Sequence, residues 1–245
     1  MTKMIKMDLY RFFRSTSTWI ILFAAAILAF LSVMLVHINT SIQLYSNAGE
    51  LLAAQINGGM LMVLCAVAVI IFVGAKYKNG FIKNIANQLP RRELLVLPEI
   101  IVSSVACAFY FFAYSACTIT AGAVFFGNTF ITFSFLDIIK LLIAQFVLHW
   151  SFCCLLMLLY MLTNSTTAAM VIGLLISFKI LNVFYALVER FTHFNIAQYM
   201  LDSNIFQIGM ESTKLIYSRA VIVSLLSLLA EIILLCVVMR KKDIK

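Results

Sequence analysis

The chain has 245 residues, of which 64% are hydrophobic and only 11% charged, and its formal net charge is +8. A soluble domain carries roughly a quarter of its residues as charged ones, so this composition excludes a water-soluble globule and predicts an all-α protein in a lipid bilayer. The basic residues lie at the ends of apolar segments rather than on one accessible face, which argues against nucleic-acid binding and indicates membrane orientation.

Six stretches are long and apolar enough to cross a membrane, which takes about 20 residues. In chain order they cover approximately residues 19–36, 58–73, 100–125, 138–162, 168–188 and 220–239. The first has the basic flank of a signal peptide, but it is long and no small-x-small cleavage site followed by a soluble domain comes after it. We therefore expect it to be retained as a span.

Lysine and arginine predict the orientation of these spans, because they are kept on the cytoplasmic side. An inside amino terminus gives the cytoplasmic set Lys3, Lys6, Arg11, Arg14, Lys76, Lys78, Lys83, Arg91, Arg92, Arg240, Lys241, Lys242 and Lys245, and the outer set Lys140, Arg190, Lys214 and Arg219. We therefore expect a multi-pass protein of the plasma membrane with both termini cytoplasmic. The outer loop 189–218 mixes aromatic and polar residues, which predicts short helices at the outer interface.

The segment YKNGFIKNIANQLPRRELL, residues 77–95, holds most of the densest cluster of charge and lies between the second and third spans. On a helix its apolar residues form one stripe: Phe81, Ile82, Ile85 and Leu89. The other faces hold Lys78, Lys83, Asn84, Asn87 and Gln88. Asn79-Gly80 can break the chain before this helix, and Pro90 ends it. The pattern leaves two interpretations open, a helix lying on anionic lipid or a docking helix for a cytoplasmic partner.

Two charged residues fall deep inside predicted spans, Lys179 in the fifth and Glu231 in the sixth. Each costs about 2.5–3.5 kcal/mol at the centre of a helix. Their depths differ by about 4–5 Å at about 1.5 Å per residue, so we expect an ion pair that packs the two spans. Two alternatives stay open: one or both residues line a conduit, or Lys179 snorkels to the interface.

Metal and catalytic signals are weak in this chain. The cysteines all lie in apolar runs without C-x-x-C spacing, and His149 has no second ligand three or four residues away. His149 and Ser151 point apart on a helix, so they form no catalytic pair. We expect no metal site and no catalytic residue.

The order of these features resembles the small membrane subunits of ABC-2 type transporters, which work beside a separate ATPase. Residues 4–22, MIKMDLYRFFRSTSTWIIL, are similar to the basic amphipathic segment before the first span of that family. The stretch VGAKYKNGFIKNIANQLPRRELL is similar to its glycine-centred motif after the second span, with matching positions at Tyr77, Gly80, Ile82, Lys83 and Arg91. The chain departs from the pattern at Lys76, where many members have an acid, and at Phe81, where threonine is common.

The resemblance implies a single transmembrane domain over residues 1–245, with an interfacial segment at 1–17 and a coupling-helix loop at 76–95 that fits a groove of the ATPase. The residues implied in this contact are Asn79, Gly80, Phe81, Ile82, Lys83, Ile85, Leu89 and Arg91. The implied partners are a cytoplasmic ABC ATPase in two copies, carrying ATP and magnesium, and a second permease, identical or related. The implied cargo is an antimicrobial peptide, a lantibiotic or a drug.

The chain lacks the G-x-x-x-x-G-K-[ST] loop that cradles phosphates, so we expect it to be no enzyme and to bind no cofactor directly. Two other functions stay open. A proton-coupled secondary transporter would use Glu231 and Lys179 as its relay, although such proteins usually show internal repeats or broken helices. A membrane sensor or scaffold that transports nothing would need no ATPase groove.

Overall fold

The computed structural model describes residues 2–39, 45, 47–78, 92–127, 134–210 and 212–241, and this part of the chain is helical without strands. Its elements are α1 (Thr2–Arg14), α2 (Thr16–Ile38), α3 (Ala48–Ile56), α4 (Met60–Lys78), η1 (Arg92–Leu95), α6 (Val96–Phe126), α7 (Phe135–Thr163), α8 (Thr166–Ser177), α9 (Leu181–Thr192), η3 (Ala197–Tyr199), α10 (Leu201–Gln207) and α11 (Lys214–Lys241). The predicted all-α fold agrees with these elements. The outer-loop segment 189–218 contains η3 and α10.

In the part of the chain that the structure describes, five helices are long and apolar enough to cross a membrane: α2, α4, η1 with α6, α7 and α11. Each coincides with one of the stretches predicted from hydropathy. Helices α8 and α9 pass the same test only as a pair, and they are bent by 61° at the break between them. The protein is therefore a multi-span helical membrane protein, and its described residues contain five such spans, or six if the bent pair counts as one.

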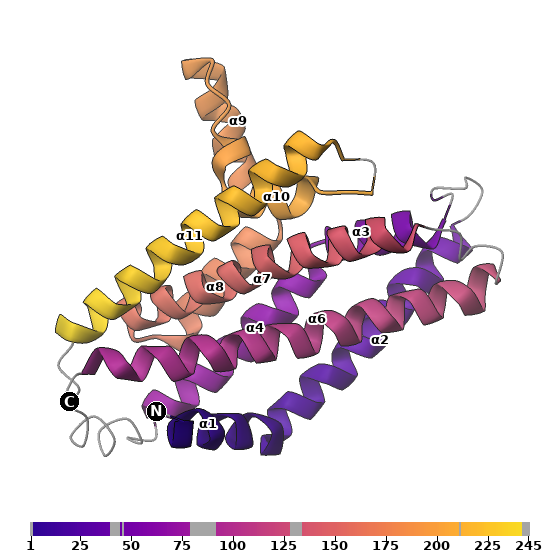
Figure 1. Cartoon of the computed structure of the whole chain (residues 1–245). Helices are drawn as coiled ribbons and strands as arrows, with labels where there is room; N and C mark the ends of the chain where they lie inside the picture. Colours follow the sequence, from indigo (N-terminus) through magenta and orange to yellow (C-terminus); the bar gives the residue numbers. More distant parts are fainter. Residues whose placement is uncertain are drawn as a thin grey trace.

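The fifth predicted span, 168–188, is not continuous. Helix α8 ends at Ser177, and Lys179 adopts a left-handed backbone conformation with φ of 60° before α9 begins. A non-glycine residue in this conformation interrupts a right-handed helix. Helix α9 then projects away from the bundle (Figure 1), and none of its residues is buried.

Helix α7 lies at the centre of the bundle and packs against α11, α4, α6 and α8. Helix α2 packs mainly along α6 through a face of small and branched residues that includes Ala25 and Ala29. The other sides of α2 and α11 are apolar and exposed, as at Phe23 and Leu226. Exposed apolar helix faces of this length are typical of helices that contact lipid.

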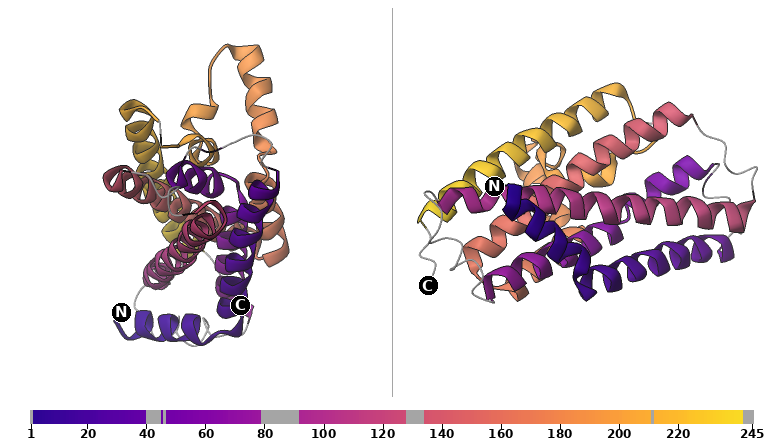
Figure 2. Two further views of the ribbon diagram at one scale, coloured as in Figure 1. Left: turned by 90° about the vertical axis from the view of Figure 1, so that its right-hand side faces the viewer. Right: turned by 60° about the horizontal axis from the view of Figure 1, so that its bottom comes forward.

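Helix α1 lies across the end of the bundle and runs transverse to α2 (Figure 2). The turn between them is held by Thr18, whose hydroxyl donates to the Phe12 carbonyl at 2.6 Å. The Phe12 ring is buried and meets Phe72 of α4 and Tyr110 of α6 edge to face, at 5.8 and 6.0 Å between ring centroids. Helix α1 is thereby packed onto the end of the bundle where α4 and α11 end and α6 begins (Figure 1).

Candidate functional site

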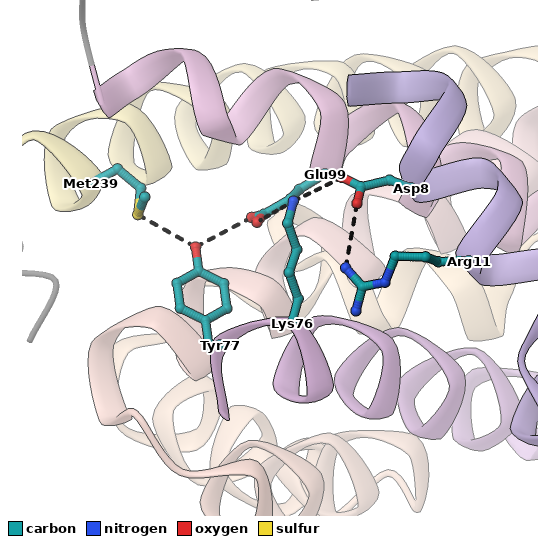
Figure 3. Close-up of polar contacts among 6 residues, drawn as sticks. All are labelled: Asp8, Arg11, Lys76, Tyr77, Glu99 and Met239. Atoms are coloured by element: carbon teal, nitrogen blue, oxygen red, sulfur yellow. Dashed lines mark hydrogen bonds and ion pairs between the residues drawn. The ribbon is translucent and has the colours of Figure 1, made fainter. Parts of the chain in front are cut away.

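A buried ionic cluster joins three helices at this end of the bundle (Figure 3). The Lys76 ammonium of α4 donates a hydrogen bond to Oδ2 of Asp8 in α1 at 2.8 Å, and it lies 3.1 Å from Oε1 of Glu99 in α6. All three side chains are fully buried. An ammonium between two carboxylates is the arrangement that makes burial of these charges tolerable.

Two further side chains extend the cluster. Arg11 lies 3.6 Å from the second oxygen of Asp8, so two acids and two bases balance in charge. The Tyr77 hydroxyl lies 3.4 Å from both Oε2 of Glu99 and the sulfur of Met239 in α11. Helices α1, α4, α6 and α11 therefore meet at one neutral polar cluster (Figure 3).

The local sequence favours each of these positions. Asp8 and Phe12 are four residues apart and form the buried face of the amphipathic helix α1. Lys76 lies in the last turn of α4, and Glu99 lies in the first turn of α6. A cation at a helix carboxyl end and an anion at a helix amino end both interact favourably with the helix dipole.

Residues of the cluster lie shortly before and shortly after the predicted coupling segment in the chain. Helix α4 ends at Lys78, and η1 begins at Arg92. The predicted ATPase-contact residues, from Asn79 to Arg91, lie outside the described residues. A force applied to this segment reaches α4 and α6 first, and the buried ion pairs connect both helices to α1.

The sequence interpretation counted Lys76 among the basic residues of the cytoplasmic side and made no prediction about its burial. The structure buries its ammonium, and Asp8 and Glu99 neutralise it inside the protein. The partners are distant in the sequence, so no local spacing reveals them. The available signal was one acid in the amino-terminal segment, Asp8, and one in the span that follows this loop, Glu99, in a chain with few acids.

The structure does not bring Lys179 and Glu231 together as an ion pair. Lys179 lies at the break after α8, where its ammonium lies 4.4 Å from the centroid of the Phe206 ring. Glu231 is buried in α11 and accepts a hydrogen bond from the Ser151 hydroxyl of α7 at 3.1 Å. Among the described ion pairs none joins the two.

Three buried thiols converge between α4, α6 and α7, at Cys65, Cys107 and Cys153, with their sulfur atoms within 4.8 Å of one another. His149 lies one turn from Cys153, and its Nδ1 pairs with the Gln145 carbonyl at 2.7 Å. Thiolates could hold a soft metal ion here. The C-x-x-C test applied to the sequence could not find this group, because each cysteine comes from a different helix.

No family model matches the chain, and no curated protein matches it. The similarity to ABC-2 permeases therefore depends on the segments 4–22 and 77–95 and on the order of the spans.

Proposed function

We propose that this protein is the permease subunit of an ABC exporter of the ABC-2 class, driven by a separate cytoplasmic ATPase. The observation that carries the proposal is the buried cluster of Asp8, Lys76 and Glu99, which fastens α4 and α6 to α1 on either side of segment 79–91. A permease that hydrolyses no nucleotide needs such a rigid connection, because movement enters through a short loop and must reach the membrane helices.

The physical chemistry of the cluster supports this role. Separating buried charges leaves each without its partner in a medium of low dielectric constant, which is costly. The three helices therefore move together at this end when the loop is displaced. Interfaces held by discrete contacts of this kind shift between defined arrangements rather than deforming continuously.

The proposal includes specific partners and a location. The ATPase acts in two copies below a pair of permeases in the plasma membrane, with the termini of each permease in the cytoplasm. The second permease is identical or related and completes the conduit. The cargo is hydrophobic or amphipathic, namely an antimicrobial peptide, a lantibiotic or a drug.

Co-purification from the native membrane tests the coupling segment. We expect a protein with a phosphate-binding loop and ATPase activity to accompany the wild type and to be lost when Ile82, Ile85 and Leu89 are all changed to Asp. The matched control changes Asn84 and Asn87 to Asp and Gln88 to Glu, which adds the same charge to the other faces of the same helix. Loss in both variants, or in neither, would refute the assignment of the apolar stripe to ATPase docking.

One observation favours the rival secondary transporter, namely the break between α8 and α9. Broken helices line the substrate sites of many such transporters. Transport in sealed vesicles separates the two proposals. An ABC permease works with ATP after a protonophore has collapsed the proton gradient, whereas a proton-coupled transporter stops.

A further inference from the structure

A half-open cavity of about 530 Å³ lies between α7, α11 and the chain that follows the break after α8. Its walls are mostly apolar. Its volume lies within the range of about 300–1,000 Å³ that holds drug-sized ligands. The cavity is separate from the ionic cluster, because its lining residues on α11 lie between Val223 and Glu231, whereas the cluster contacts α11 at Met239, near its carboxyl end.

Two carboxylates line this apolar cavity, Glu231 from α11 and Asp202 from the first turn of α10. Each residue is about 95% buried, with a relative exposure of 5%. Glu231 accepts a hydrogen bond from Ser151, and both oxygens of Asp202 are within 3.3 Å of the Tyr185 hydroxyl. Among the described lining residues there is no Lys, Arg or His, so the wall supplies no positive charge to match these acids.

Aromatic rings occupy the same wall. Phe152 comes from α7, Tyr185 from α9 and Tyr199 from η3. The faces of such rings attract organic cations, and the attraction grows when water is excluded. Carboxylates and aromatic faces around an apolar cavity thus favour a ligand that is both apolar and positively charged.

We propose that this cavity binds a hydrophobic organic cation, with Glu231 and Asp202 as its counter-charges. This inference names the cargo class of the permease proposed above and, as a statement about transport, rests on that function. The cation site itself needs no ATPase. A carboxylate in the middle of a spanning helix is costly unless something compensates it, and a bound cation supplies the compensation that Lys179 does not.

Two probe ions of nearly the same size and shape but opposite charge test the site, tetraphenylphosphonium and tetraphenylborate. Each is dialysed separately against the purified full-length protein in neutral detergent, and the bound fraction gives its Kd. We expect wild-type protein to bind the phosphonium saturably and the borate far more weakly. Equal binding of both ions, or no saturable binding of the phosphonium, would overturn the proposal.

Substitutions then locate the site. Glu231→Gln keeps the hydrogen bond from Ser151 and removes the charge, and we expect it to raise the Kd of the phosphonium at least about tenfold. Asp202→Asn should raise the Kd in the same direction. The control Glu189→Gln changes an exposed acid of α9 outside the cavity and should leave the Kd unchanged.

Each outcome decides something. If Glu231→Gln and Glu189→Gln bind the phosphonium equally well, the cavity is not the site. If Glu231→Gln does not elute as a monodisperse protein, the comparison of the two ions on wild-type protein and the Asp202→Asn variant decide the question. Because no ATPase is present in this assay, a negative result leaves the coupling proposal intact, and loss of ATPase co-purification leaves the cation site intact.

Discussion

Removing the central ammonium of the buried cluster gives the sharpest test of its energetics. Lys76→Met keeps an unbranched side chain of similar length but leaves Asp8 and Glu99 without their shared cation. Loss of one partner from a buried ion pair costs about 3–5 kcal/mol. Asp8 keeps Arg11 at 3.6 Å, and among the described residues Glu99 keeps the Tyr77 hydroxyl, so we expect a loss near the lower end, about 3 kcal/mol.

A second substitution shows whether the stranded charge is the cause. Lys76→Met combined with Glu99→Gln leaves the Asp8–Arg11 pair and no unpaired acid, so we expect it to recover most of the lost stability. The free energy of unfolding is measured by titration with sodium dodecyl sulfate in mixed micelles, followed by circular dichroism. Lys140→Met is the control, because its ion pair with Asp137 is exposed and should contribute only about 0–1 kcal/mol. Interacting residues give non-additive changes in stability. The reasoning would be refuted if the double variant lost the sum of the stabilities that Lys76→Met and Glu99→Gln lose singly.

Two further predictions concern packing and pH. Gly74→Ala should destabilise the protein by about 1–3 kcal/mol, because its new Cβ would overlap Cγ2 of Thr166 in α8. Adding Thr166→Ser should restore stability in the same unfolding assay, and a single Gly74→Ala variant as stable as the wild type would contradict this prediction. Burial raises the pKa of Asp202 above its ordinary value of 3.8, although the Tyr185 hydroxyl opposes the shift. The folded state therefore holds this proton more tightly, and the contribution of Asp202 to stability falls as pH rises from about 3.8 through its raised native pKa. The melting temperature measured across that pH range should show this decline in the wild type and not in Asp202→Asn. Parallel profiles of melting temperature against pH for the two proteins would contradict the prediction.

Hydropathy predicted the continuous spans well because lipid imposes one simple requirement, about 20 consecutive apolar residues in a helix. The break in the fifth span escaped the same reasoning, since Lys179 turns the chain without a glycine or proline. The two helices still pass the hydropathy test as a pair, so hydropathy does not mark the break. The bend is held by tertiary contacts such as the packing of Lys179 on Phe206, which the local pattern does not contain.

The buried cluster escaped for a different reason. The positive-inside rule treats each lysine by its place in a loop, and Lys76 lies just where a span gives way to a loop. Its true environment depends on Asp8 and Glu99, which reach it only after three helices have packed. Sequence reasoning thus predicted which segments enter the membrane better than it predicted which charges they enclose.

The same cluster sets an order for biogenesis. Asp8 is made before Lys76 and Glu99, so its contact with the Lys76 ammonium can form only after residue 76 has been made. At about 5–20 residues per second, α1 precedes Glu99 by about 5–20 s. During that interval the buried face of α1, including Phe12, lacks its contacts with Phe72 and Tyr110. Helix α1 can therefore reach its final position only after α4 and α6 have followed it.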